Sequence, residues 1–269
     1  MKSERLRSYS KINLALWIKN KRPDGYHEIE SVFFENKNLC DEICVKVEPD
    51  NSKNIKVEFA QKDLNSQILP ETNHAFKAAK LFFEKIGYRG SCTIKIDKKI
   101  PIQAGLGGGS SNAASVLKAL NIIFDYQLHE SELLLLAKEI GSDVPFFILG
   151  GICLVSGKGE ILKKLDSKLN FNIQVIKPAD VSISTKWAYD EFDLFGKEFD
   201  RDKQMKALLN ALQASNHELF FSNMFNDFED VIFNKYPQIL DLRNKLLSEG
   251  FKKVMLCGSG SAVFGIKEV

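Results

Sequence analysis

The chain has 269 residues, of which 44% are hydrophobic and 27% are charged, a composition typical of a globular protein with one large domain or two smaller lobes. Its 37 basic and 35 acidic residues leave a net charge of +2, which gives no electrostatic case for binding nucleic acid or a membrane surface. The first residues are polar and no apolar run reaches about 18 residues, which excludes a signal peptide or membrane span. We therefore expect a cytoplasmic protein whose partner is a small molecule.

The five cysteines form no C-x-x-C pair, and most lie in segments with the alternation of β-strands. We predict that they are reduced packing residues and that they hold no metal. They are Cys40, Cys44, Cys92, Cys153 and Cys257.

The first predicted element is a strand over residues 12–18, where apolar side chains alternate with others. Lys11 and Asn13 therefore share one face of this strand. On the pattern alone, the simplest interpretation is an edge strand with that face in solvent.

A turn follows at Pro23-Asp24-Gly25, and it presents Tyr26 and His27 side by side. An aromatic ring next to an imidazole can stack on a flat heterocycle and hydrogen-bond it. Ordinary half-buried packing explains the same two residues equally simply.

Segments 43–47 and 55–59 alternate and predict two strands of an antiparallel sheet. A helix follows over residues 75–86, for which Thr72 or Asn73 can serve as the N-cap. A strand at 92–96 then leads into a segment rich in glycine.

That glycine segment spans residues 101–115 and reads PIQAGLGGGSSNAAS. Four of the chain's 17 glycines lie between Gly105 and Gly109, where the backbone can approach an anion and point its amides at it. The apolar spacing downstream predicts a helix that begins near Ser111, whose free amides and dipole favour a phosphate. The pattern therefore predicts a polyphosphate site, although a glycine-rich turn before a helix remains the alternative.

Two common phosphate loops are excluded by their spacing. A Walker A loop needs Lys and then Ser or Thr after its last glycine, but Ser110 follows Gly109. A dinucleotide fingerprint that began at Gly105 would need glycine at position 110.

The next helix is predicted from Ser131 to Gly141, and Asp143 follows it two residues before Pro145. Asp143 has the position of an N-cap, because proline is favoured in a first helical turn. A capping carboxylate and a catalytic carboxylate are compatible, since both must be fixed and ionised.

The second half of the chain alternates strand and helix signals. A lobe boundary is expected between 152 and 178, where a strand pair at 152–162 is followed by an alternating segment at 171–175 that leads to Pro178. Thr185 and Tyr189 are four residues apart, so they lie on one side of a short helix. Residues 201–250 read as mostly helical with a break before Pro237, and 253–265 read as a strand, a glycine turn and a returning strand.

The strand with Lys11, the segment 101–115 and the turn 258–262 together resemble the GHMP kinase superfamily, named for galactokinase, homoserine kinase, mevalonate kinase and phosphomevalonate kinase. Shorter blocks resemble those members that act on 4-diphosphocytidyl-2-C-methyl-D-erythritol. These blocks lie at 10–14, 22–28, 141–145 and 184–189, and the resemblance runs from about residue 6 to residue 265.

The resemblance implies ATP-dependent phosphorylation of the tertiary 2-hydroxyl of that compound, in the non-mevalonate route to isoprenoid precursors. It implies an α+β fold with an N-terminal lobe like domain 2 of ribosomal protein S5, a C-terminal α/β sandwich lobe, and the active site in the cleft. We assign the lobes to residues 1–155 and 156–269. The second lobe looks short at its end, since a further helix and edge strand would be expected.

The same resemblance assigns the site. Lys11 and Asp143 would form the catalytic pair, and Asn73 would lie near the adenine. Asn13 and Thr185 would contact the acceptor, whose cytosine would lie between Tyr26 and Tyr189 with His27 at its edge. The ATP phosphates would be held by Pro101, Gly105, Leu106, Gly107, Gly108, Gly109, Ser110 and Ser111.

For the mechanism, we expect Asp143 to orient the hydroxyl and accept its proton late, since a carboxylate that caps a helix is a weak base. Mg²⁺ is expected to arrive with ATP, because no separate carboxylate cluster would fix it, so no metal site is assigned to the protein. The partner would be a small molecule with a cytidine diphosphate group, and the protein a monomer or weak homodimer. Two alternatives stay open: a kinase for a small alcohol such as homoserine or mevalonate, and a nucleotide-binding sensor.

Overall fold

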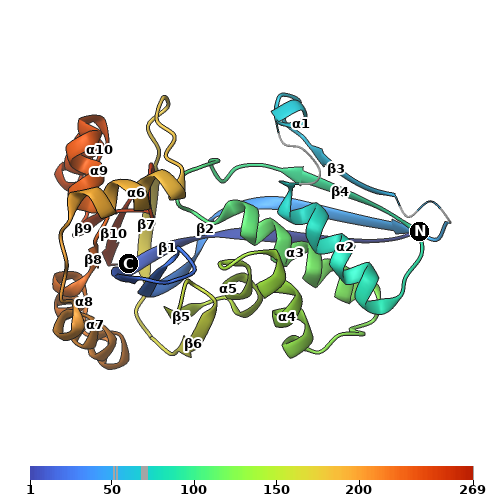
Figure 1. Ribbon diagram of the computed structural model, residues 1–269, viewed down its shortest axis with the longest axis horizontal. Helices are drawn as coiled ribbons and strands as arrows, with labels where there is room; N and C mark the ends of the chain where they lie inside the picture. The colour runs from blue at the N-terminus through green and yellow to red at the C-terminus, as the bar shows by residue number, and fades with distance from the viewer. Residues whose placement is uncertain (51, 53, 68–71, 269) are drawn as a thin grey trace. The chain divides into compact units, whose positions relative to one another are not determined.

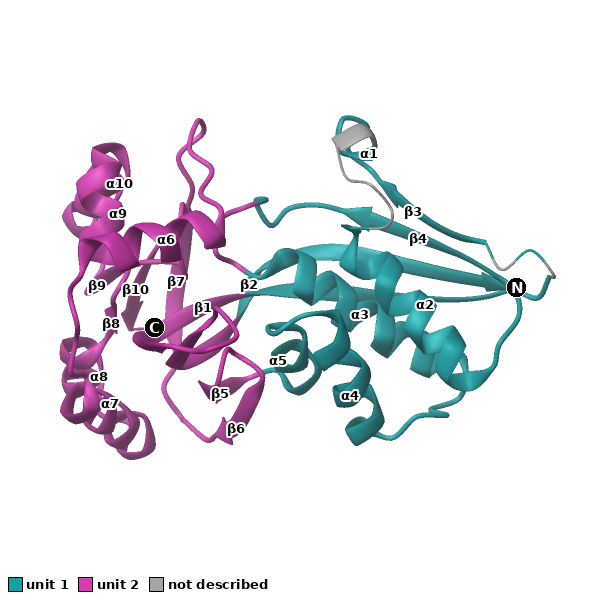
Figure 2. Cartoon of the chain, viewed as in Figure 1, with its two compact units in different colours: residues 1–10, 36–102, 107–150 teal, residues 11–35, 103–106, 151–269 magenta. Residues whose placement is uncertain are grey.

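The computed structural model describes residues 1–269 except 51, 53, 68–71 and 269 (Figure 1). The chain forms two compact units (Figure 2). Unit 1 comprises residues 1–10, 36–102 and 107–150, and unit 2 comprises 11–35, 103–106 and 151–269. The chain passes from unit 1 to unit 2 for the last time at Gly150–Gly151, and unit 2 also takes two earlier segments. The reason is that the strands β1 (Lys2–Lys21) and β2 (His27–Glu48) each contribute residues to both units. The assignment of lobes to residues 1–155 and 156–269 stays a prediction.

Unit 1 contains a sheet of β3 (Ile55–Phe59), β4 (Ser91–Asp97) and parts of β2 and β1, in that order. β4 pairs antiparallel with β2, with Val45 opposite Ile94, and parallel with β3, with Val57 opposite Ile94. The predicted strands at 43–47 and 55–59 are confirmed, but the prediction that their sheet is antiparallel was wrong, because β3 runs parallel to β4. β4 lies between these two strands, and local alternation carries no information on strand order.

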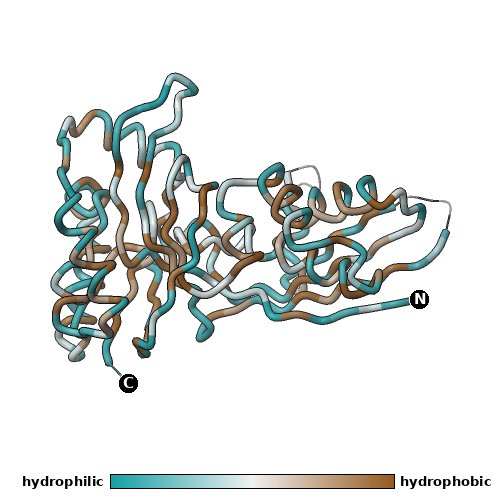
Figure 3. Tube along the Cα trace, turned by 90° about the horizontal axis from the view of Figure 1, so that it is seen from below, coloured by the Kyte–Doolittle hydropathy of each residue, from teal (hydrophilic) through white to brown (hydrophobic). Residues whose placement is uncertain are grey.

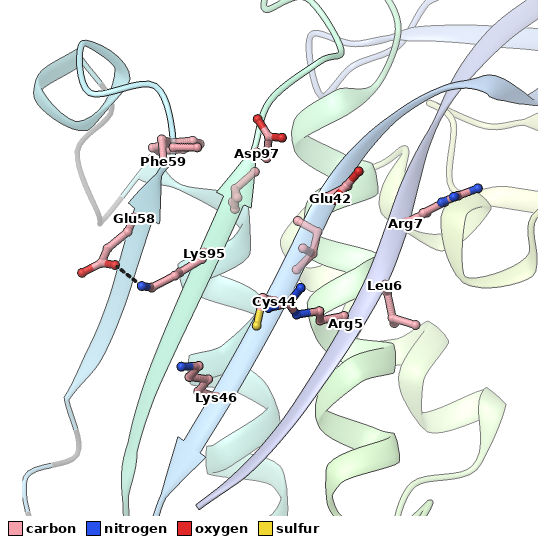
Figure 4. Close-up of a pocket in the computed structure, with 13 residues that line it drawn as sticks. Arg5, Leu6, Arg7, Glu42, Cys44, Lys46, Glu58, Phe59, Lys95 and Asp97 are labelled. Atoms are coloured by element: carbon pink, nitrogen blue, oxygen red, sulfur yellow. Dashed lines mark ion pairs between the residues drawn. The ribbon is translucent and has the colours of Figure 1, made fainter.

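One face of this sheet is covered by helices, while Figure 4 shows the opposite face in front with the helices behind it. Apolar side chains such as Ile43, Val45 and Ile94 are buried, whereas the intervening Lys95 is exposed. This period-two pattern is the cause of the one-sided covering. The helices of unit 1 are α1 (Leu64–Gln67), α2 (His74–Ile86), α3 (Gly108–Ile123), α4 (Glu130–Ile140) and α5 (Val144–Leu149).

In unit 2, short strands pair with β1 and β2. β5 (Ile152–Ser156) pairs antiparallel with β2 and with β6 (Ile161–Leu165), and β8 (Phe225–Asn226) runs parallel to β1, with Ala15 opposite Phe225. A second, antiparallel sheet has the order β7-β10-β9. Its strands are β7 (Phe171–Ile176), β9 (Lys253–Leu256) and β10 (Val263–Glu268). The predicted terminal strand, glycine turn and strand are thus confirmed.

The helices of unit 2 bury one side against a common core that includes Leu16, Phe228, Ile232 and Leu256. In Figure 3 the helices alternate teal and brown along their turns, as amphipathic helices do. None of the helices in the described part of the chain has the length and hydropathy needed to cross a bilayer. The helices are α6 (Thr185–Phe195), α7 (Asp202–Ala214), α8 (His217–Asn223), α9 (Glu229–Lys235) and α10 (Pro237–Ser248).

Candidate active site

Lys11 and Asn13 share one face of β1 as predicted, but this face is not in solvent. Their exposed fractions are 5% and 1%. The Lys11 ammonium donates to Asn13 Oδ1 at 2.8 Å and lies 4.5 Å from the centroid of the Phe33 ring. The prediction of a solvated edge was therefore wrong. A buried ammonium needs polar partners, and Asn13 Oδ1 is one of them.

The Asn13 amide is oriented by a second hydrogen bond. Its Nδ2 donates to Ser31 Oγ at 2.9 Å, and Ser31 Oγ donates to the Ala15 carbonyl at 2.5 Å. Because Nδ2 is engaged on β2, Oδ1 is the atom that faces Lys11. Ser31 was not among the predicted site residues, since a single serine in an alternating strand carries no functional signal.

The turn between β9 and β10 approaches the residues around Lys11 closely. A Cβ on Gly258 would lie 3.1 Å from the Gly105 carbonyl oxygen and 3.4 Å from Lys11 Nζ. A Cβ on Gly105, whose φ is +73°, would lie only 1.7 Å from the carbonyl oxygen of Cys257. Glycine is thus required at both positions, because two backbone segments meet without room for a side chain.

Asn226 fixes this turn from the other side. Its Nδ2 donates to the carbonyls of Leu256 and Gly258 at 3.0 and 2.8 Å. Burial raises the pKa of the Cys257 thiol, which keeps it neutral in the presence of Lys11. Sequence patterns gave no indication of Asn226, because it lies in a short strand within a region that reads as helical.

In unit 1 the glycine segment leads into α3, which begins at Gly108, three residues earlier than predicted. The helix starts early because Gly107 adopts a left-handed φ of +69° as its N-cap. The Ser111 amide donates to the Gly107 carbonyl at 2.9 Å, so it is not free to bind an anion. The amides at positions 108–110 lie in the first turn, where a helix offers its amides no carbonyl partner, and a Cβ on Gly109 would meet no atom within 4 Å.

A buried polar network supports the first turn of α3. Asp41, with no exposed surface, accepts hydrogen bonds from Lys98 Nζ at 2.5 Å and from Asn112 Nδ2 at 2.8 Å. It also accepts from the backbone amides of Lys99 and Ile100 at 2.7 and 2.8 Å, directly before Pro101. Asp41 therefore binds both flanks of the glycine segment. Sequence reasoning missed it because its partners lie more than fifty residues away.

Lys98 brings a positive charge to the same place. A Cβ on Gly108 would lie 3.0 Å from Lys98 Nζ. The ammonium is thus close to the helix N-terminus, where the helix dipole also favours a negative ligand. Asn112 Nδ2 further donates to Ser8 Oγ at 2.9 Å, and Ser8 Oγ donates to Ser111 Oγ at 2.7 Å.

Asn73 and Asp143 both occupy N-cap positions in unit 1, and they behave differently. Asn73 Oδ1 accepts from the Ala75 amide at 2.8 Å, so the predicted cap of α2 is confirmed. Asp143 stands at the N-cap position of α5, but its side chain makes no capping hydrogen bond. The predicted cap interaction was wrong, because the backbone of Asp143 is already helical, with φ −82° and ψ −13°. The capping argument for Asp143 as a weak base loses its support.

His74 was not predicted and lies beside these residues. Burial lowers the pKa of His74, the charge of Lys77 lowers it further, and the negative charge of Asp143 acts in the opposite direction. Asp143 is therefore electrostatically coupled to His74 within unit 1.

The residues predicted to hold a base lie in unit 2. The His27 ring stacks on Tyr189, with centroids 4.9 Å apart and planes 14° apart. His27 Nε2 lies 2.7 Å from Asp193 Oδ1 on the same helix as Tyr189. Tyr26 is 56% exposed, and Lys158 Nζ lies 4.7 Å from the centroid of its ring.

Thr185 begins α6, and its Oγ1 accepts a hydrogen bond from Ser259 Oγ at 3.3 Å. Unit 2 therefore brings Lys11, Asn13 and Gly105 together around the Gly258 turn, and Thr185 is tied to the next residue of that turn. Asp143, Asn73 and the start of α3 belong to unit 1. The predicted pairing of Lys11 with Asp143 stays a prediction.

A groove of about 630 Å³ lies on the open face of the unit 1 sheet (Figure 4). None of the predicted site residues lines it. Arg5, Cys44 and Lys46 line it, and Lys95 forms an ion pair with Glu58 there, at 3.7 Å. These side chains come from alternate positions of four strands, which is the pattern of a sheet face turned to solvent.

Two family models match the chain: the GHMP kinases N terminal domain over residues 73–151 and the GHMP kinases C terminal domain over residues 206–268. Together with the α+β fold and its two sheets, these matches define a GHMP kinase, as the sequence motifs predicted. Its fold is similar to a homoserine kinase from Cytophaga hutchinsonii, with a TM-score of 0.78 at 18% identity over 100% of this chain and 86% of that one.

Relatives with higher sequence identity belong to one narrower family. The chain is 38% identical to 4-diphosphocytidyl-2-C-methyl-D-erythritol kinase of Caldicellulosiruptor bescii, over 97% of this chain and 88% of the relative. It is 39% identical to the enzyme of that name from Alkaliphilus oremlandii, over 99% and 88%. A crystal structure of 4-(cytidine 5′-diphospho)-2C-methyl-D-erythritol kinase has a TM-score of 0.76 at 32% identity, over 98% and 90%. The chain belongs to this kinase family, and it is an ATP-dependent small-molecule kinase.

Proposed function

We propose that the protein transfers the γ-phosphoryl group of ATP to the 2-hydroxyl of 4-diphosphocytidyl-2-C-methyl-D-erythritol, in the non-mevalonate route to isoprenoid precursors. The observation that carries the proposal is the environment of Lys11. Its ammonium is buried, donates to Asn13 Oδ1 at 2.8 Å, and lies beside a turn where only glycine fits at position 258. A fixed cation of this kind suits a reaction in which charge on a moving phosphoryl group must be neutralised.

The ATP phosphates fit the backbone around the start of α3. Gly109 leaves its outer side open, Gly107 has the left-handed conformation, and the first-turn amides at 108–110 are available. The same segment includes Pro101, Gly105 and Leu106, which we also assign to the phosphate site. Ser110 and Ser111 would add hydroxyl groups, although the Ser111 hydroxyl already accepts a hydrogen bond from Ser8. Asn73 is proposed to lie near the adenine of ATP.

Lys11 and Asp143 are proposed as the catalytic pair. Phosphoryl transfer passes through a loose transition state, so the main tasks are in-line positioning and charge neutralisation. The hydroxyl oxygen forms a bond to the γ-phosphorus as the bond to the ADP oxygen breaks. Asp143 orients the hydroxyl and accepts its proton late, and Lys11 favours the developing negative charge. We therefore expect a rate that changes little with pH through the neutral range, and a steep rise that requires a group titrating near neutrality would contradict the late transfer.

Mg²⁺ usually binds through phosphates, waters and one or two carboxylates. In the described part of the chain, no group of three or more His, Cys, Asp or Glu side chains could hold a metal. We propose that the ion arrives with ATP, bound to its phosphates. When bound, Mg²⁺ would neutralise phosphate charge.

The acceptor is proposed to bind in unit 2. Tyr26 and Tyr189 would clasp the cytosine, and His27 would hydrogen-bond its edge. Asn13 and Thr185 would contact the part of the substrate that carries the hydroxyl. A small alcohol such as homoserine offers nothing flat for these rings to contact, which favours the cytidylated acceptor.

The test is ATP consumption by the purified protein, with 4-diphosphocytidyl-2-C-methyl-D-erythritol, homoserine and mevalonate offered separately. We expect turnover on the cytidylated acceptor alone. Equal turnover on a small alcohol would overturn the substrate assignment, and nucleotide binding without any turnover would favour a sensor. We further propose that the protein is cytoplasmic. We also propose that it is a monomer or weak homodimer, and sedimentation analysis would test this oligomeric state.

A further inference from the structure

His27 is connected to two charged residues that were not predicted to belong to the site. Its Nε2 lies 2.7 Å from Asp193 Oδ1, and the other carboxylate oxygen of Asp193 accepts from Lys21 Nζ at 2.6 Å. The His27 side chain is 5% exposed, whereas those of Asp193 and Lys21 are 31% and 54% exposed. Lys21 and Asp193 are 172 residues apart in sequence, so only the fold brings them together.

The state of the Asp193 carboxyl decides where the His27 proton lies. Partial burial raises the pKa of Asp193, but hydrogen bonds from Lys21 and His27 outweigh it and hold the pKa below its ordinary value. An ionised carboxylate can only accept hydrogen bonds, so the nitrogen that faces it must carry a proton. In neutral His27 the proton is therefore on Nε2, and Nδ1 has a free lone pair.

Nδ1 is also the nitrogen that a ligand could use, because it has no hydrogen-bond partner among the residues that the structure describes. The His27 ring is held in place by its stack on Tyr189 and by an edge-to-face contact with Phe192, whose ring centroid lies 6.5 Å from that of His27. A base edge that donates to Nδ1 would lie near the imidazole plane. Since that plane is within 14° of the Tyr189 ring, the phenol would be nearly parallel to the base, as stacking requires.

We propose that Asp193, held by Lys21, is a positioning residue that keeps the His27 proton on Nε2 and thereby makes Nδ1 an acceptor selective for the amino group of cytosine. Uracil has a carbonyl oxygen where cytosine has this amine, so two lone pairs would face each other and the base would be disfavoured. This inference rests on the proposed function, because it concerns the base of the cytidylated acceptor.

A purely structural role for Asp193 is the alternative, in which it ties the turn after β1 to α6. The two roles differ in their consequences. A structural tie affects stability and the binding of every ligand alike, whereas a fixed tautomer affects the choice between two bases.

The experiment measures binding of cytidine 5′-diphosphate and uridine 5′-diphosphate to the full-length protein by titration calorimetry. Asp193→Asn keeps the shape of the side chain but allows it either to accept from or to donate to Nε2. Asp190→Asn removes the same charge from the exposed side of α6 and serves as the matched control. We expect a preference for the cytidine nucleotide of about tenfold or more in the unaltered protein and in Asp190→Asn, as one hydrogen bond provides. In Asp193→Asn the preference should fall to within about threefold.

Nitrogen-15 NMR of the imidazole gives an independent readout on the unaltered protein, and it does not depend on whether a variant folds. We expect the Nε2–H tautomer, and a mixture of tautomers in Asp193→Asn. An Nδ1–H tautomer in the unaltered protein, or an unchanged base preference in a folded Asp193→Asn, would overturn this inference alone. Equal affinity of the unaltered protein for both nucleotides would overturn it together with the proposed acceptor.

Discussion

Replacing Gly109 with alanine separates the stability of the glycine segment from its use as a phosphate site. Gly109 lies in the first turn of α3, its φ is not positive, and a Cβ there would meet nothing within 4 Å. Alanine is favoured over glycine in a helix by about 0.5–1 kcal/mol. For a protein of this size, a gain at the lower end corresponds to a rise in the melting temperature of about 1–2 °C.

The same methyl group should weaken ATP binding, since it stands on the side from which a phosphate would approach the first-turn amides. Loss of one charge-assisted hydrogen bond costs about 1.5–3 kcal/mol, which is about 10- to 150-fold in affinity. Melting curves and calorimetric titration with a non-hydrolysable ATP analogue measure the two effects on one sample. A variant that melts higher yet binds the analogue as tightly as before would refute the assignment of these amides to the phosphates.

Gly105→Ala is the contrasting variant. Its Cβ would overlap the Cys257 carbonyl oxygen at 1.7 Å, and its φ is +73°. The left-handed conformation alone costs about 1–2 kcal/mol in a residue with a Cβ. We therefore expect Gly105→Ala to lower the melting temperature while Gly109→Ala raises it. Equal melting temperatures in the two variants would contradict the close approach of the two backbones.

Three further predictions concern charged groups. Lys11→Met should lower kcat about 100-fold or more while an ATP analogue still binds, because the lost charge acts on the transition state; unchanged kcat would remove Lys11 from the mechanism. Asp41→Asn should lower the free energy of unfolding by about 3–5 kcal/mol in urea titrations, since it leaves Lys98 buried without its anion. The double variant Asp41→Asn, Lys98→Met should then be more stable than Asp41→Asn alone, and an equal or lower stability would contradict this explanation. Burial raises the pKa of Glu229 to about 7, so the folded protein keeps a proton that the unfolded chain loses above about pH 4.5. The free energy of unfolding should therefore fall by up to about 3 kcal/mol as pH rises from about 4.5 to 7, and Glu229→Gln should abolish this part of the slope; an equal slope in the variant would assign it to other groups.

Local sequence signals predicted the features that depend on neighbouring residues. Asn73 was assigned as a cap from the pattern that follows it, and the structure has its Oδ1 on the Ala75 amide. The strand face shared by Lys11 and Asn13 follows from the alternation of a strand. Alternation does not reveal what covers the second face, which is why the burial of these two residues was missed.

Features made by distant segments escaped prediction. β8 has two residues and exists because it pairs with Ala15 and Leu16 more than two hundred positions earlier. Asp41 and Asp193 likewise gain their meaning from partners across the fold, and each reads in the sequence as an ordinary surface acid. The start of α3 at Gly108 depended on the left-handed conformation of Gly107, which sequence permits but does not require.

The choice of acceptor has to be made by side chains, because the backbone does not make it. The fold resembles a homoserine kinase with a TM-score of 0.78 and a kinase of its own family with 0.76, so the two architectures are equally close. The proposed phosphate segment would act mainly through backbone amides, which are the same for any acceptor. Under the proposed function, the groups that distinguish a cytidylated acceptor from a small alcohol would be His27, Tyr189 and Asp193, two of which share helix α6. A change of acceptor in this fold would then require substitutions on that helix and the turn beside it while the glycine segment stays unaltered.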